Sequence, residues 1–109
     1  MSISVTVSNP SNKEQQSVNI PVATEAVFRN FWEVGSSELG LNWVPLFEVG
    51  IEVTKEDAGE VIAELRELES WAKKTLLNQQ EVIQIQDRIK RMIEEIPKII
   101  STGNSVFIG

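Results

Sequence analysis

Histidine, cysteine and tyrosine are all absent from this chain of 109 residues. Without cysteine there are no disulfides, zinc thiolates or thiol nucleophiles. Without histidine, the chain lacks the commonest general base near neutral pH and the commonest metal ligand. Only carboxylates, amines, hydroxyls and amides remain for chemistry, and no glycine-rich phosphate loop occurs. We therefore expect a protein that is not an enzyme and that uses no cofactor and no metal.

Long apolar runs are also missing from the sequence. No stretch approaches the ~18 consecutive apolar residues that a membrane helix needs. The first seven residues lack the basic start and apolar run of a secretory signal. Hydrophobic residues nevertheless make up 41% of the chain, enough for one packed core. The composition predicts a single domain over residues 1–109, located in the cytoplasm and not bound to a membrane.

Positive charge is scarce, and the imbalance is concentrated in one region. The net charge is −6 for the whole chain, but residues 25–69 contain 11 acidic and three basic side chains, a net of −8. From residue 78 onward, acids and bases are equal in number. Because binding to a phosphate backbone needs clustered Lys and Arg, we expect no direct nucleic-acid binding.

Two alternating patterns predict strands near the N-terminus. Apolar and polar residues alternate over residues 2–8, and again over residues 18–22. Pro21 cannot donate a hydrogen bond to a neighbouring strand, which indicates either an edge strand or the end of a strand. Between them, residues 9–16 read as a polar turn, so the two strands are expected to form a hairpin with a long loop.

The middle of the chain predicts a helix followed by an extended segment. Thr24 is a suitable N-cap for a helix that should end between Val34 and Leu39, because glycines weaken its later turns. Residues 41–53 read as extended, with Pro45 separating an entry segment from the strand. Thr54 with Asp57 resembles a capping box at the start of the next helix.

Two amphipathic helical patterns follow. The first runs from residue 58 to residue 76, and the second has a coiled-coil-like seam whose members are Val82, Ile85, Ile89, Met92, Ile96 and Ile99. Asn78 could cap the second helix, which favours a helical hairpin, although one continuous helix paired with another copy is an open alternative. Pro97 should kink or end the last turn, Gly103 should cap it, and residues 105–108 should form a final strand.

These elements predict an α+β fold in the order β-β-α-β-α-α-β. About four strands would form a small antiparallel or mixed sheet, covered on one face by helices. The C-terminal part would be a helical hairpin.

Seven residues are candidates for protein binding. Glu48 and Glu52 would lie on one face of the predicted strand, about 13 Å apart, which is too far for a glycosidase-type carboxylate pair. A second group follows one side of the predicted helix as an acidic stripe: Glu56, Glu60, Glu64 and Glu67. The seventh candidate is Trp43, because Trp32 and Trp71 fit a core whereas Trp43 lies in a loop, where an exposed indole often anchors an interface.

Three functional hypotheses follow from these patterns. The first is a non-catalytic interaction protein that binds a basic protein partner through its acidic surface, as an inhibitor or immunity-type protein would. The second is a structural or assembly subunit that forms homo-oligomers through its C-terminal helices. The third is an enzyme or small-ligand binder that uses carboxylates at Glu33, Glu38, Glu48 and Glu52. The first is preferred because of the net charge of −8 over residues 25–69, and the third is ranked last.

Overall fold

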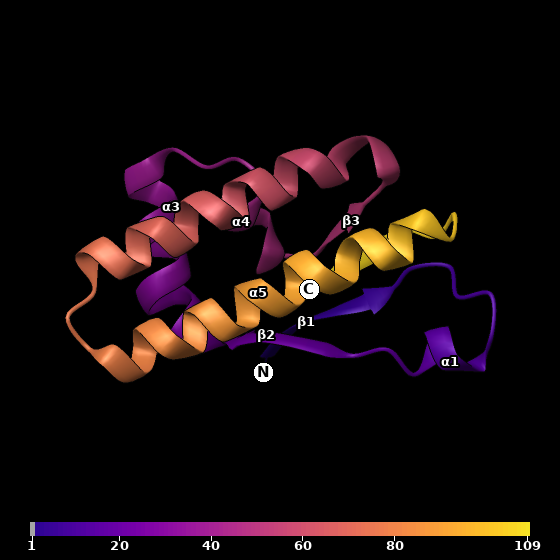
Figure 1. Cartoon of the computed structure of the whole chain (residues 1–109), viewed down its shortest axis with the longest axis horizontal. Helices are drawn as coiled ribbons and strands as arrows, with labels where there is room; N and C mark the ends of the chain where they lie inside the picture. The colour runs from indigo at the N-terminus through magenta and orange to yellow at the C-terminus, as the bar shows by residue number, and fades with distance from the viewer. Residues whose placement is uncertain (1) are drawn as a thin grey trace.

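A four-stranded antiparallel sheet and two long helices form the framework of the protein (Figure 1). The computed structural model describes residues 2–109. Its elements are, in chain order, β1 (Ser2–Val7), α1 (Lys13–Gln16), β2 (Ile20–Thr24), α2 (Glu25–Val27), the π-helix η1 (Phe28–Trp32), α3 (Glu33–Leu39), the 3-10 helix η2 (Val44–Phe47), β3 (Ile51–Val53), α4 (Lys55–Thr75), α5 (Gln79–Ser101) and β4 (Val106–Ile108). The predicted α+β class and order of the main elements are confirmed.

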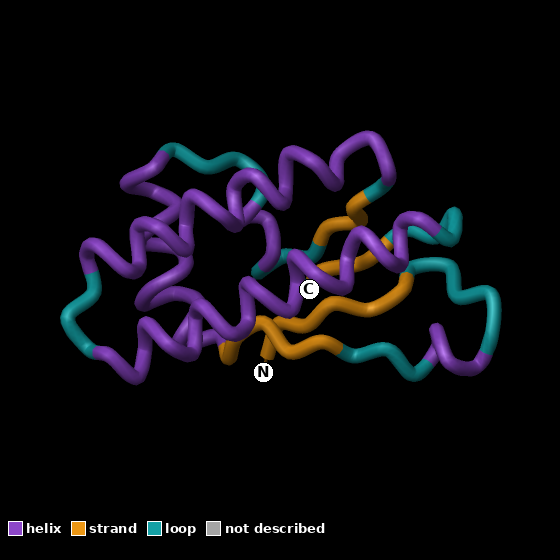
Figure 2. The backbone as a smooth tube through the Cα atoms, viewed as in Figure 1, coloured by secondary structure: helices purple, strands orange, loops and turns teal. Residues whose placement is uncertain are grey.

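The strands are arranged in the order β2-β1-β4-β3 (Figure 2). The C-terminal strand β4 therefore lies between β1 and β3, and every neighbouring pair is antiparallel. The strand β2 lies at one edge, which is one of the two positions that Pro21 indicated. Alternate residues of β1 are buried, which confirms the period of two that identified it.

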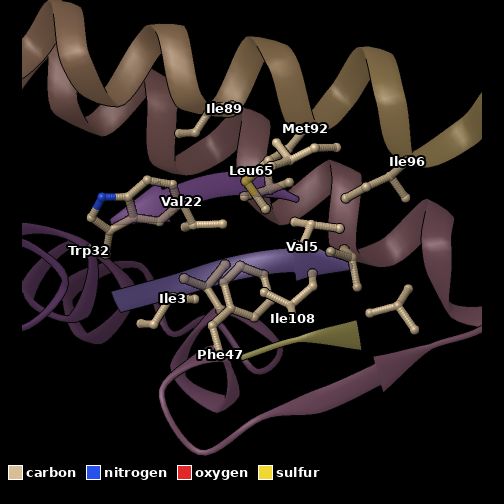
Figure 3. Close-up of a cluster of buried hydrophobic side chains, with 14 of the residues drawn as sticks. Ile3, Val5, Val22, Trp32, Phe47, Leu65, Ile89, Met92, Ile96 and Ile108 are labelled. Carbon is tan, nitrogen blue, oxygen red and sulfur yellow. The ribbon is translucent and has the colours of Figure 1, made fainter. Parts of the chain in front are cut away.

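The core lies between the sheet and the two long helices. Side chains of Ile89, Met92 and Ile96 on α5 point toward Val22 and Val5 of the sheet (Figure 3). All six members of the predicted apolar seam of α5 are buried. Because this seam packs within the chain, the feature that suggested self-association is already used inside the protein.

The helical hairpin is confirmed, and the alternative of one continuous helix is wrong. The chain leaves helical geometry at Leu76, whose backbone is extended (φ −78°, ψ 135°). Asn78 then accepts hydrogen bonds from the backbone N–H groups of Gln80 and Glu81 and starts α5. An Asn N-cap satisfies donors that a helix start otherwise leaves unpaired, so this side chain favours a new helix at this point.

The structure differs from the local predictions at four places. Residues 41–53 are not one extended segment, because η2 occupies residues 44–47 and only Ile51–Val53 is a strand. Pro45 is the second residue of the 3-10 turn, where its fixed φ is favourable and its missing N–H costs little. Residues 9–16 contain the single-turn helix α1, which Asn12 caps. The other two differences concern Pro97 and the start of α4.

Pro97 does not end α5, which continues to Ser101. The ring removes one N–H, but its neighbours Ile96 and Ile99 are buried and hold the turn against the core. At the start of α4, the Thr54 hydroxyl donates to the Asp57 carboxylate (3.2 Å) and makes no cap bond to the helix backbone. Gly103 follows α5 with φ +91°, as its predicted capping role requires.

Candidate functional site

The buried carboxylate of Glu64 binds the backbone of the segment that precedes η2. Its Oε2 accepts from the N–H of Asn42 (3.0 Å), and its Oε1 accepts from Trp43 (2.9 Å) and Val44 (3.1 Å). Only 9% of Glu64 is exposed. We call this arrangement the Glu64 clasp. It satisfies N–H groups at the start of the 3-10 turn that would otherwise lack partners.

The acidic stripe predicted on α4 is therefore not one continuous solvated face. Glu64 lies inside it but points its charge at the backbone, so it is unavailable to a partner. The unfavourable spacing of like charges along one helix face was a usable signal that one of them has an internal role. The spacing alone could not identify which one, since Glu60 and Glu67 have the same chemistry.

Trp43 is held in place from two sides. Its backbone N–H belongs to the Glu64 clasp, and its indole Nε1 donates to Glu60 Oε2 at 3.0 Å. The residue is half-buried, and Glu60 is exposed. The indole ring is thus already fixed next to an exposed carboxylate. Because it is fixed before binding, it would lose little conformational entropy on entering an interface.

Glu56 and Glu67 remain on the surface of α4. A hydrogen bond from its own backbone N–H, in the first turn of α4, lowers the pKa of the Glu56 carboxyl from its ordinary value. Glu67 borders a surface hollow whose other lining includes Leu39 at the end of α3 and the buried Trp71. The hollow places Glu67 at the junction of α3 and α4.

Glu48 and Glu52 do not share a strand face, contrary to the prediction. Glu48 follows η2 and binds Arg29, with Nη2 to Oε1 at 3.1 Å and Nε to both oxygens at 3.3 Å. Glu48 raises the pKa of the Arg29 guanidinium, chiefly through these hydrogen bonds. Glu52 lies in β3 and is exposed. The pair is separated because only the latter part of the expected strand forms.

Most carboxylates of residues 25–69 have no cationic partner. Among residues 2–109 there are two ion pairs, and only Arg29–Glu48 lies in the acidic region. On α3, the exposed Glu33 and Glu38 line a shallow hollow together with Arg29. Between these two residues on α3, Ser36 is buried and its hydroxyl donates to the Trp32 carbonyl (2.7 Å).

The four carboxylates of the third hypothesis are divided between two places: Glu33, Glu38 and Glu48 lie around Arg29, and Glu52 lies in β3. In the described part of the chain, no group of three or more acidic side chains is placed to hold a metal ion. The four carboxylates named in the third hypothesis lie on α3, after η2 and in β3. None of the helices described for residues 2–109 has the length and apolar character required to cross a bilayer.

Family models, curated proteins and solved structures gave no match to this chain. Its function therefore has to be inferred from the geometry and charge of its own residues.

A second internal polar site was not anticipated from the sequence. Asn104 is 5% exposed and joins the loop after β1 to the end of α5. Its Nδ2 donates to the Asn9 carbonyl (2.6 Å) and Ser11 Oγ (3.1 Å), while its Oδ1 accepts from Gln15 Nε2 (3.0 Å) and Thr102 Oγ1 (2.6 Å). All these bonds are internal, so Asn104 has a structural role.

Proposed function

We propose that this chain is a non-catalytic interaction protein that binds a basic protein partner through the exposed carboxylates of α3 and α4. We call these carboxylates the acidic surface, and its members are Glu33, Glu38, Glu56, Glu60 and Glu67. Trp43 borders this surface through its bond to Glu60 and is the aromatic anchor of the proposed interface. Inhibition of a basic enzyme, as by an immunity-type protein, is the role that this composition suits best.

The observation that carries the proposal is the unneutralised charge of the region. Residues 25–69 have a net charge of −8, yet they contain one ion pair among the described residues. Like charges that are held close together on a surface oppose folding and create a potential that attracts cations. A basic partner removes this repulsion on binding, and the same field speeds its approach.

Glu64 is excluded from the acidic surface, which changes the choice of test variants. Charge reversal at Glu64 would disrupt the Glu64 clasp and confuse loss of folding with loss of binding. Glu33 and Glu38 are exposed and make no ion pair. The double variant Glu33→Lys/Glu38→Lys therefore changes the electrostatic potential of the acidic surface with little change in the free energy of unfolding.

The test is affinity capture from a lysate of the native cell, followed by association kinetics with the captured protein. We expect a stoichiometric basic protein that is retained at low ionic strength and released by ~0.5 M salt, where the Debye length is only a few ångströms. The double variant on α3 should bind it with a lower association rate constant.

The matched control is Asp87→Lys/Glu94→Lys, which makes the same charge change on exposed residues of α5. This control should change the association rate much less at intermediate salt, because the two positions lie outside the acidic surface. Equal effects of the two double variants, or binding that is insensitive to salt, would contradict the proposal.

A further inference from the structure

The two edges of the sheet differ in their capacity to accept another strand. The edge strand β2 contains Pro21, which has no N–H to donate, so this edge is protected. The opposite edge is β3, whose one neighbouring strand among residues 2–109 is β4.

Backbone hydrogen bonds at both ends of the ladder between β1 and β4 determine which residues of β4 are bonded to β1. Ser4 and Gly109 exchange both backbone bonds (3.2 and 3.0 Å), and the N–H of Ser8 donates to the Ser105 carbonyl (2.9 Å). Bonded pairs alternate with non-bonded pairs along an antiparallel ladder. Halfway between these two bonded positions lies Phe107, so its N–H and C=O are directed toward β1.

The phase of the next ladder follows from this. Because the N–H and C=O of Phe107 point toward β1, those of its neighbours Val106 and Ile108 point toward β3. Their partners are Val53 and Ile51, respectively. The residue between these partners is Glu52, and its N–H and C=O must point away from β4, toward the open edge.

The side chain of Glu52 is free as well. It is exposed, lies opposite Phe107 and takes part in neither ion pair of the described residues. The backbone is still extended at Thr54 (φ −97°, ψ 176°), but the Thr54 carbonyl already accepts from Asp57 and Ala58 in the first turn of α4, so the edge is confined to Glu52. Ile51 and Val53 face inward, and Val53 is fully buried. The edge thus offers one unpaired donor, one unpaired acceptor and a carboxylate at a single residue.

A second copy of the chain is a poor occupant for this edge. Symmetric antiparallel pairing through the outward groups of Glu52 would place this residue directly opposite itself. Like charges at such a cross-strand position are destabilising, whereas opposite charges are favourable. The carboxylate thus selects against self-pairing and in favour of a strand with a basic side chain.

We infer that β3 is a docking edge, where an extended segment of a basic partner adds as an antiparallel strand with Lys or Arg opposite Glu52. This inference rests on the proposed function for the identity of the partner. It adds the mode of recognition: main-chain hydrogen bonds provide the attachment, and the Glu52 carboxylate provides the preference for charge.

The test uses the full ¹⁵N-labelled chain and two synthetic peptides, acetyl-Thr-Val-Lys-Val-Thr-amide and its counterpart with a central glutamate. With the lysine peptide, the amide signals of Glu52 and Thr54 should shift, and hydrogen exchange of the Glu52 amide should slow. Signals of β2 should not change. The lysine peptide should bind roughly two- to fivefold more tightly than the glutamate peptide, as one cross-strand charge pair allows.

Two variants sharpen the test. Glu52→Lys should reverse the preference between the peptides. Glu52→Pro removes the outward N–H but leaves the groups of Ile51 and Val53 that face β4, so the fold should persist while peptide binding is lost. A dispersed NMR spectrum checks that this variant is folded.

Several outcomes would overturn the inference. These are the absence of shifts at Glu52, equal affinity for the two peptides, and shifts that appear without peptide as the protein is concentrated, which would indicate self-pairing. A partner captured equally well by the wild type and by Glu52→Pro would refute the docking edge and leave the proposed function intact. If the peptide binds at β3 but no basic protein is captured, the docking edge stands and the proposed function is refuted.

Discussion

Removing the Glu64 carboxylate is expected to destabilise the protein more than removing any exposed acid of α4. Each hydrogen bond to a charged acceptor contributes about 1.5–3 kcal/mol when its loss leaves a buried donor unpaired. The clasp has three such bonds, but Asn42 is exposed and its N–H regains water when the carboxylate is removed. For Glu64→Ala we therefore expect a loss of about 3–5 kcal/mol in the free energy of unfolding.

Glu64→Gln separates the hydrogen bonds from the volume of the side chain. The glutamine carbonyl can keep the two bonds that Oε1 now accepts from Trp43 and Val44. Its NH₂ group would then face the N–H of Asn42, where two donors cannot bond. We expect a loss of about 1.5–3 kcal/mol, between that of the alanine variant and that of an exposed control.

The assay is equilibrium unfolding in urea, followed by tryptophan fluorescence. Glu67→Ala is the matched control, because it removes an exposed carboxylate from the same helix and should change stability by less than about 0.5 kcal/mol. In the folded Glu64→Ala protein, Trp43 should also become more exposed and its emission should shift to the red. If Glu64→Ala and Glu67→Ala unfold within about 1 kcal/mol of each other, the clasp does not hold the segment as described.

Two further predictions concern packing and the internal polar site. Gly35→Ala should cost about 1–2 kcal/mol, because its Cβ would lie 2.6 Å from both Leu68 Cδ1 and Trp71 Cε3, and this overpacking exceeds the gain in helix propensity. A Cβ at Gly59 on α4 would have no neighbour within 4 Å, so Gly59→Ala should stabilise the protein by about 0.5–1 kcal/mol. Thermal unfolding checks both predictions, because Gly35→Ala should lower the melting temperature and Gly59→Ala should raise it. Asn104→Ala should cost about 2–4 kcal/mol and speed amide exchange in residues 9–17, and unchanged exchange there would count against its bridging role.

The sequence predicted the elements whose signal is local and repeated. The period-two pattern of β1 and the apolar seam of α5 each place one face of an element in the core, and burial confirms both. Capping residues were also predictive where a side chain bonds to its own turn. The Thr24 hydroxyl accepts from the Val27 N–H at the start of α2, and the Asn78 side chain accepts from N–H groups at the start of α5. The first residues of these two helices could therefore be predicted from the sequence.

The predictions failed where a distant residue decides local structure. Residues 41–47 look extended because they are mostly apolar and lead into the alternating pattern of residues 47–53, yet Pro45 and the Glu64 carboxylate favour a 3-10 turn. Pro97 looks like a helix end, yet burial of its neighbours on both sides keeps it within α5. Propensity is a weak effect of a few tenths of a kilocalorie per residue, and tertiary contacts outweigh it.

The sequence by itself determined the class of fold and the size of the negative charge, and it favoured the helical hairpin and an edge position for β2. These depend on composition, periodicity and bonds within a few residues. Only the tertiary structure decided that Glu64 is an internal acceptor while Glu60 and Glu67 stay exposed, and that Glu52 lies at an open edge. The physical reason is that identical carboxylates differ only in what the fold places around them, and the strand that directs Glu52 outward, β4, lies 54 residues further along the chain.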